Sequence, residues 1–185
     1  MEDTIRLREL KKKDESKLLT WRNLPEVANF MFTAHKITPE EHRKWFSGIR
    51  QDRSKRYWVV EMDSKDVGLV CLYNISEQNR RCYWACYLAD PVVRGKGVGS
   101  FVEYSILNYV FFTLELNKLC GEILSFNSEV IEQQKKFGFQ QEGLLREHII
   151  KGDKILDVVL MAMLRNEWIE KKPLVESSLK AKKII

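Results

Sequence analysis

Three glycines and two cations stand within six residues, 94–99, of the stretch VVRGKGVGS. The stretch lies between an apolar, aromatic-rich run and a segment with helical spacing. Small residues let the backbone approach an anion, and the N–H groups in the first turn of a helix point toward it. Arg94 and Lys96 can neutralise its charge. These residues favour a cradle for a diphosphate, with a plain glycine-rich turn as the alternative.

Two other phosphate-binding motifs fit this stretch poorly. A Walker loop needs a glycine five residues before Gly95, where Asp90 stands, and a serine or threonine after Lys96, where Gly97 stands. A dinucleotide fingerprint follows the first strand of a βαβ unit, whereas the strands predicted before this stretch form an antiparallel meander.

The elements that must position these residues follow from hydrophobic periodicity. Runs rich in β-branched and aromatic residues predict strands over residues 4–10, 56–62, 66–75, 82–89, 118–126 and 140–164. The last of these ranges holds two strands, which form a hairpin that turns at Gly152-Asp153. Helical spacing predicts helices over residues 13–23, 26–32, 37–52, 100–116 and 127–139. Asp14 and Thr38 are predicted N-caps, Glu41 completes a capping box with Thr38, and Gly138 is predicted to end the last helix.

Length and composition predict one domain. A chain of 185 residues, 44% of them hydrophobic, can bury one sizeable core. We expect a single α+β domain over residues 1–172 and a lysine-rich, loosely held tail over 173–185. The charged start lacks the apolar core of a signal peptide, and no run reaches the roughly 18 apolar residues of a spanning helix. We therefore expect a cytoplasmic protein without a membrane partner.

Charge and cysteine content suggest neither a nucleic-acid partner nor a metal site. The net charge of +5 is modest and comes partly from the tail, so it supports nucleic-acid binding only weakly and fits a basic rim for an anionic ligand equally well. The four cysteines lack CxxC spacing and lie in predicted strands, which favours reduced core thiols over a metal site or disulfides. They are Cys71, Cys82, Cys86 and Cys120.

Two motifs carry a resemblance to a known family. R-x-x-G-x-G at Arg94, Gly97 and Gly99 resembles the acyl-CoA-binding motif of the GCN5-related N-acetyltransferase (GNAT) superfamily. Asn127, followed eleven residues later by Gly138-Phe139, is similar to the family's N-x-x-A…Y-x-x-x-G-F helix. The resemblance spans roughly residues 4–168. It implies a mixed, mostly antiparallel sheet of about seven strands flanked by helices, with a splay between strands 4 and 5, and acetyl-CoA as coenzyme.

The resemblance also implies where coenzyme A would bind. The amides of pantetheine would pair with free backbone groups between the parted strands, as an added strand does. The amides of the glycine stretch would hold the diphosphate, and Asn127 is a further candidate. The implied residues are Tyr87, Leu88, Ala89, Arg94, Gly95, Lys96, Gly97, Val98, Gly99, Ser100 and Asn127.

Acetyl transfer to an amine requires a base, because an ammonium has no lone pair. Glu122, in an otherwise apolar strand, stands where several family members carry that base, and a carboxylate facing water is the alternative. Gln134 stands where the family commonly has a tyrosine that protonates the leaving thiolate. An amide can donate a hydrogen bond to sulfur but has no proton to give up. Water, the incoming ammonium, or a hydroxyl such as that of Tyr87 or Tyr104 would then supply the proton, or the enzyme is slow.

The region before the glycine stretch resembles one branch of the superfamily. Residues 18–46, LLTWRNLPEVANFMFTAHKITPEEHRKWF, are similar to the nucleotide-aminosugar N-acetyltransferases of the pseudaminic acid pathway. This implies a UDP-linked amino sugar as acceptor, for bacterial surface or flagellin glycosylation, and leaves a homodimer open. The residues assigned to the acceptor are Arg22, Met31, Phe32, His42, Trp45 and Trp84. Core packing is the alternative for Met31, Phe32 and Trp45, and a surface position is the alternative for His42.

Two other functions stay open at this point. Ribosomal-protein and spermidine acetyltransferases share parts of the same region, so a protein N-terminus or a polyamine is the alternative acceptor. The glutamine at position 134 also leaves room for an acyl-CoA-binding module that has lost turnover.

Overall fold

The computed structural model describes residues 4–49 and 51–185. Residues 1–3 of the predicted domain and residue 50 of the predicted third helix lie outside this part. A seven-stranded sheet with the order β1-β2-β3-β4-β5-β7-β6 forms the centre of the described chain. Its strands are β1 (Ile5–Glu9), β2 (Arg56–Met62), β3 (Lys65–Ser76), β4 (Arg81–Leu88), β5 (Lys118–Leu124), β6 (Gln140–Lys151) and β7 (Lys154–Leu164).

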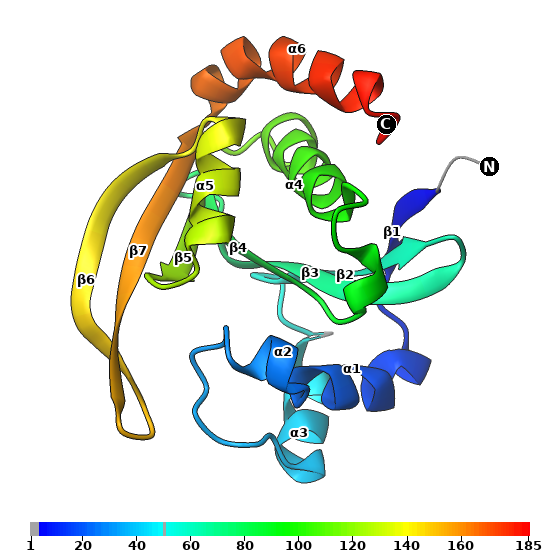
Figure 1. The fold of residues 1–185 in the computed structure, drawn as a ribbon, viewed down its shortest axis with the longest axis vertical. Coiled ribbons are helices and arrows are strands. Elements are labelled where there is room, and N and C mark those ends of the chain that lie inside the picture. Colours follow the sequence, from blue (N-terminus) through cyan, green and yellow to red (C-terminus); the bar gives the residue numbers. More distant parts are fainter. Residues whose placement is uncertain (1–3, 50) are drawn as a thin grey trace.

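Helices cover both faces of the sheet (Figure 1). Their bounds are α1 (Glu15–Arg22), α2 (Pro25–Ala28), α3 (Pro39–Ile49), α4 (Val98–Asn108), α5 (Ser128–Phe137) and α6 (Arg165–Ala181), with short turns η1 (Lys12–Asp14) and η2 (Pro91–Val93) and a π-helical end to α4, η3 (Tyr109–Thr113). One face carries α1 to α3 and the other carries α4 and α5. Val59 and Val60 illustrate the alternation, because the first packs in the core under α1 and α3 and the second in the core under α4.

The feature that matters most for function is the parting of β4 from β5. These two strands are parallel and pair from Arg81 opposite Lys118 to Trp84 opposite Gly121. Beyond that pair, β4 continues against β3 as far as Leu88, whereas β5 continues against β7. The predicted mixed sheet of seven strands with a splay between β4 and β5 is therefore confirmed.

Local signals placed most element ends correctly. Thr38 and Glu41 form the predicted capping box, with the Glu41 N–H donating to Thr38 Oγ1 (3.2 Å) and the Thr38 N–H to Glu41 Oε2 (2.8 Å). Gly138 ends α5 with φ 106°, a left-handed conformation that favours glycine. Asp14 is the N-cap residue of α1, as predicted, but its side chain makes no capping hydrogen bond. Its buried carboxylate instead accepts hydrogen bonds from Arg8 (2.7 and 2.8 Å).

The chain after residue 172 also differs from the prediction of a loosely held tail. It is the second half of α6, which continues through Pro173 and packs on α4. Val175 and Leu179 are buried on that side, and the side chain of Ile184 lies against Gly97. The lysines of this segment, Lys180, Lys182 and Lys183, are exposed, and the sequence reasoning did not recognise the apolar stripe on the other side of the helix.

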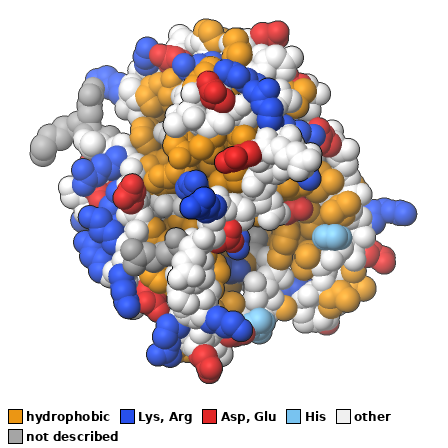
Figure 2. Space-filling model, turned by 180° about the vertical axis from the view of Figure 1, so that it is seen from behind, with side chains coloured by type: hydrophobic (Ala, Val, Ile, Leu, Met, Phe, Trp, Pro, Cys, Tyr) orange, Lys and Arg blue, Asp and Glu red, His pale blue; other side chains and the backbone are white. Residues whose placement is uncertain are grey.

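The four cysteines are free thiols, and two of them, Cys82 and Cys120, are buried in the sheet. Within the described residues, no helix combines the length and the apolar character needed to cross a membrane. Figure 2 shows one face of the molecule, on which basic and acidic side chains are interspersed around a broad apolar area.

Candidate active site

The backbone groups of β4 alternate between two neighbours. The Ala89 N–H donates to the carbonyl of Val67 in β3 (2.8 Å), whereas the carbonyl of Arg80 accepts from the Lys118 N–H on the β5 side (3.1 Å). Every second residue of a strand turns its N–H and C=O to the same side. The odd-numbered residues of β4 therefore bond to β3, and the even-numbered residues face β5.

This alternation decides which groups the gap exposes. Pairing with β5 ends at Trp84, so the backbone groups of Cys86 and Leu88 turn into the gap. The expectation that Tyr87, Leu88 and Ala89 all offer unpaired groups holds only for Leu88. Tyr87 and Ala89 face β3, and Cys86 is a residue that the sequence reasoning missed, because the direction of each group depends on a register that the residue types do not encode.

The glycine stretch has the conformation that an anion cradle needs. Gly95 and Gly97 both have φ 76°, in the left-handed region where an L side chain is strained. Gly97 is the N-cap of α4, and the first helical bond runs from the Phe101 N–H to the Gly97 carbonyl (2.9 Å). The preceding N–H groups of the first turn, on Val98, Gly99 and Ser100, have no partner within the helix.

Two cations lie on the loop of the cradle, and the Asn127 side chain lies at the start of α5. Arg94 and Lys96 are exposed on the loop that enters α4. Ser100 Oγ accepts a hydrogen bond from Gln133 Nε2 (3.0 Å), which ties the first turn of α4 to α5. Asn127 is the N-cap of α5, but its side chain makes no capping hydrogen bond. Its amide therefore stays available near the end of β5.

Glu122 faces the side of the sheet that carries α1 to α3. Its carboxylate is half-buried, and Oε2 accepts a hydrogen bond from the Tyr73 hydroxyl (3.1 Å). Burial and the charge of Glu122 raise the pKa of Tyr73, so its hydroxyl stays protonated and remains the donor. Glu122 lies in a central strand between β4 and β7. The sequence reasoning did not find Tyr73, whose approach to Glu122 depends on the pairing of β3, β4 and β5.

Gln134, in α5, and Trp84, in β4, lie together on the opposite face of the sheet. Trp84 is 8% exposed and Gln134 is 4% exposed. A Cβ on Gly121 would lie 3.3 Å from both amide atoms of Gln134 and 3.5 Å from Trp84 Nε1, so both side chains surround this glycine. The Trp84 ring also stacks on Phe139 with centroids 6.3 Å apart. Trp84 was expected at the acceptor, but the structure places it on the other face.

A pair of cations lies on the face of Glu122. Arg22, at the end of α1, is half-buried and donates to Thr33 Oγ1 (3.1 Å). Lys151, at the tip of the β6–β7 hairpin, donates to the carbonyls of Ala28 (2.6 Å), Asn29 (3.0 Å) and Met31 (3.0 Å). The hairpin is thereby fastened to the end of α2, and Figure 1 shows it reaching down past the sheet toward that helix.

Burial affects both members of this pair. It lowers the pKa of Arg22, and Tyr87 partly offsets that effect. Burial lowers the pKa of Lys151 as well, and the charge of Arg22 lowers it further. The two positive charges therefore interact with each other. The assignment of Arg22 to the acceptor site stays a prediction, and the sequence reasoning did not point to Lys151 beside it.

On the face that carries these cations and Glu122, part of the sheet surface is not covered by a helix. Ala85, in the middle of the central strand β4, is exposed on this face. Phe30 beyond α2 and Phe126 beyond β5 contact each other with ring centroids 5.8 Å apart, although both rings are largely exposed. Met31 is half-buried and Phe32 is 36% exposed, so neither belongs to the core.

His42 and Trp45 do not match their expected place in the acceptor site. His42 is 5% exposed, and its Nε2 bonds to the carbonyl of Glu15 (2.8 Å), which joins α3 to α1. Trp45 packs edge-on against Tyr57 with centroids 5.6 Å apart. His42 therefore joins two helices, and Trp45 joins α3 to the strand β2. They were overrated because aromatic and imidazole groups suit a binding site and a core equally well.

The side chains of the two tyrosines considered as proton donors pack against other parts of the structure. Tyr104 faces α6, where its ring contacts Trp168 with centroids 5.9 Å apart. Tyr87 belongs to the cluster beneath α1 and α3. Its pKa is raised by burial and lowered in part by Arg22.

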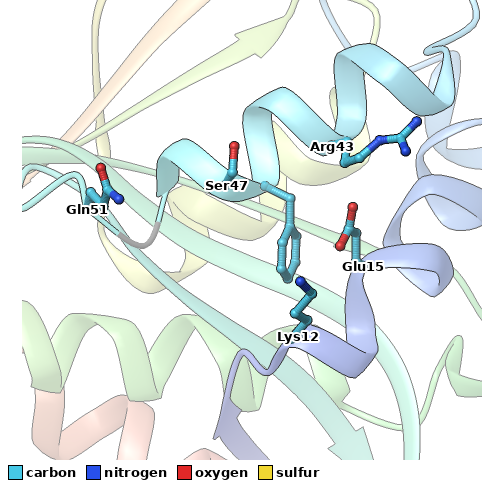
Figure 3. A pocket seen from close by; sticks show the side chains of 6 residues that line it. Lys12, Glu15, Arg43, Ser47 and Gln51 are labelled. Carbon is cyan, nitrogen blue, oxygen red and sulfur yellow. The ribbon is translucent and has the colours of Figure 1, made fainter.

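A separate pocket lies between the start of α1 and α3 (Figure 3). It shares no residue with the predicted site. Its lining residues are Lys12, Glu15, Arg43, Phe46, Ser47 and Gln51.

Comparisons with known proteins agree with this geometry. The Acetyltransferase (GNAT) domain family matches residues 4–140. Acetyltransferase PseH of Campylobacter jejuni strain 81-176 is 31% identical over 143 residues, which cover 76% of this chain and 87% of that protein. Spermidine N(1)-acetyltransferase of Escherichia coli K12 is 26% identical over 167 residues, which cover 90% of this chain and 89% of that protein. The crystal structure of spermidine N-acetyltransferase from Vibrio cholerae with CoA and spermine superposes with a TM-score of 0.83 at 24% identity, covering 89% of this chain and 98% of that one.

The chain therefore belongs to the GNAT acetyltransferase family and is an acetyl-CoA-dependent N-acetyltransferase. Its own residues fit the coenzyme. Cys86 and Leu88 offer backbone groups along the gap, and the first turn of α4 offers N–H groups for the diphosphate. Buried polar atoms of Trp84 and Gln134 lie where the gap begins. When bound there, the coenzyme supplies an acetyl group activated as a thioester.

Proposed function

We propose that this enzyme acetylates the amino group of a UDP-linked amino sugar, in pseudaminic acid or related surface-glycan biosynthesis such as flagellin glycosylation. The observation that carries the proposal is the cation pair Arg22 and Lys151 on the acceptor face. Among the residues that the structure describes, both bond only to neutral oxygens and neither has a carboxylate partner. A diphosphate would supply the missing negative charge.

The same pair argues against a polyamine. Two cations that already repel each other would also repel the positive charges of spermidine. An anion between the two cations would reduce their mutual repulsion, because a nearby opposite charge favours the charged form of each group. The relatives named spermidine acetyltransferase keep a polyamine as the second candidate, and the PseH relatives support the nucleotide sugar.

On this proposal Glu122 is the general base. It accepts the proton that the acceptor ammonium must lose before its lone pair can attack the acetyl carbon. Tyr73 occupies Oε2 of Glu122, which leaves Oε1 for that proton. The exposed surface around Ala85 gives the amine an approach to the gap from the face of Glu122.

The test is release of free coenzyme A thiol with three kinds of acceptor: UDP-linked amino sugars, spermidine, and peptides with ribosomal-protein N-termini. We expect the highest kcat/KM with a UDP-linked amino sugar. Arg22→Gln should raise the KM for that acceptor about 10-fold or more, because a hydrogen bond to a charged group contributes about 1.5–3 kcal/mol. Its kcat should change little.

Arg43→Gln is the matched control, since Arg43 is an exposed cation on α3. It should leave the KM unchanged. A higher kcat/KM with spermidine than with any nucleotide sugar would contradict the proposal. Binding of coenzyme A without acceptor-dependent thiol release would instead support the non-catalytic module.

A further inference from the structure

Two buried polar atoms near Gly121 lack hydrogen-bond partners. They are Nε1 of Trp84 and Oε1 of Gln134, and no group in the described part of the chain bonds to either. More than nine-tenths of each residue is buried. An unsatisfied buried donor or acceptor costs about 1–3 kcal/mol, so such atoms are rare in native proteins and call for an explanation.

Their position connects them to the gap. Trp84 and Gly121 form the last pair before β4 and β5 part, and both polar side chains surround Gly121. Gly121 leaves the space open, because a larger residue would place its Cβ within 3.3 Å of the Gln134 amide. The unpaired donor and the unpaired acceptor therefore stand together at the closed end of the gap, where the acyl end of coenzyme A has to lie if pantetheine follows Leu88 and Cys86.

The reaction needs a donor at that point. The leaving sulfur takes the electron pair of the broken C–S bond, and the tyrosine that commonly protonates it is replaced by Gln134. Tyr73 is bonded to Glu122 on the other face, and Tyr104 contacts α6. A thiol has a pKa of about 8.5, so its thiolate is a fair leaving group once hydrogen bonds stabilise the anion.

We propose that Trp84 is a catalytic hydrogen-bond donor, whose Nε1–H binds the departing sulfur together with the Gln134 amide N–H. The ammonium first gives one proton to Glu122. The neutral amine nitrogen then forms the new C–N bond, the C–S bond breaks with its electron pair on sulfur, and the nitrogen releases its second proton to solvent. Sulfur then takes a proton from solvent, and Glu122 returns its proton there. No general acid is required.

The second unpaired atom fits the same ligand. Pantetheine carries an amide N–H two carbons from its sulfur, and Gln134 Oε1 is an acceptor without a partner. The Trp84 N–H thus complements the sulfur of the coenzyme, and Gln134 Oε1 complements the pantetheine N–H. The inference rests on the acetyltransferase activity and not on which acceptor is used.

The test measures the thiol of bound coenzyme A by its thiolate absorbance during a pH titration. In the wild-type complex we expect a thiol pKa at least about one unit below that of free coenzyme A titrated under the same conditions. Trp84→Phe removes the N–H and keeps a ring against Phe139. It should bring the bound thiol back toward the free value and lower kcat about 10-fold or more, with the acetyl-CoA KM within about threefold.

Gln134→Leu is the second variant and should shift the thiol pKa in the same direction. Trp58→Phe is the control, because Trp58 in β2 packs on Tyr109 away from the gap. Calorimetric binding of coenzyme A shows that each variant is folded. An unshifted thiol in the wild-type complex, or the same lowered pKa in both gap variants, would overturn the proposal without bearing on the acceptor.

Discussion

Glu122 and Gly121 are neighbours in β5, yet they serve opposite faces of the sheet. Successive side chains of a strand alternate, so Glu122 faces the acceptor side while Gly121 leaves room for Trp84 and Gln134 on the coenzyme side. The parting of β4 and β5 begins at this point. On our proposals, the group that accepts the proton and the groups that bind the sulfur therefore lie on opposite faces of one sheet.

The base gives a direct prediction at the residue scale. Glu122→Gln keeps the size of the side chain but cannot accept a proton, so kcat/KM should fall by about 10²-fold or more. Acetyl-CoA affinity, measured by calorimetry, should stay nearly intact because the carboxylate lies on the other face. Glu142→Gln, an exposed carboxylate on β6, is the matched control and should behave as wild type. A wild-type rate in Glu122→Gln would remove this residue from the mechanism.

At the scale of elements, α4 and α5 are joined by a buried polar contact. Glu103 in α4 is 2% exposed and accepts from Gln133 Nε2 of α5 (3.3 Å), which also binds Ser100. Burial raises the pKa of Glu103 to about 8, and the hydrogen bond from Gln133 offsets this only in part. Burial also raises the pKa of the Cys86 thiol in β4, and the charges of Cys71 and Glu103 raise it further.

The raised pKa of Glu103 predicts a pH-dependent stability. Between about pH 4.5 and pH 8 the unfolded chain loses this proton while the folded chain keeps it, so the free energy of unfolding falls as pH rises through that window. Glu103→Gln removes this contribution. Thermal melts at pH 5 and pH 8 should therefore show a larger loss of Tm for wild type than for the variant. Equal losses in the two proteins would contradict the buried, neutral state of Glu103.

Most elements could be predicted from the sequence because their signals are local. The Thr38 capping box and the stop at Gly138 need only residues a few positions apart. The second half of α6 was not predicted as a helix, because its lysines and Pro173 are typical of a loosely held segment. The contact of Lys151 with Met31 joins residues 120 positions apart, so no local pattern could reveal it. The same holds for Cys86, whose place at the gap depends on strand register.

The glycine stretch could be predicted from the sequence more completely than the side chains of the acceptor face. A cradle of glycines is a backbone property, and Gly95 and Gly97 both adopt φ 76°, a left-handed conformation that favours glycine. Side chains on the acceptor face depend on tertiary packing. His42 and Arg22 were equally plausible binding groups by type, but only the packing of α1 and α3 buries the first against Glu15.

At the scale of the whole molecule, α6 and the residues after it complete the core beneath α4. Val175 and Leu179 are buried there, and burying such a side chain contributes about 1.5–3 kcal/mol. Deleting residues 173–185 should therefore lower Tm by about 10 °C, as followed by circular dichroism. Lys182→Gln, an exposed change in the same segment, should have no comparable effect. An unchanged Tm after the deletion would show that the segment is dispensable for folding.

The arrangement of the two faces about the end of the gap is tested most directly by a crystal structure with coenzyme A and a UDP-linked amino sugar. We predict the sulfur within hydrogen-bond distance of Trp84 Nε1 and the acceptor amine beside Glu122 on the opposite face. A sulfur located on the Tyr73 side, or a coenzyme bound outside the gap between β4 and β5, would contradict it.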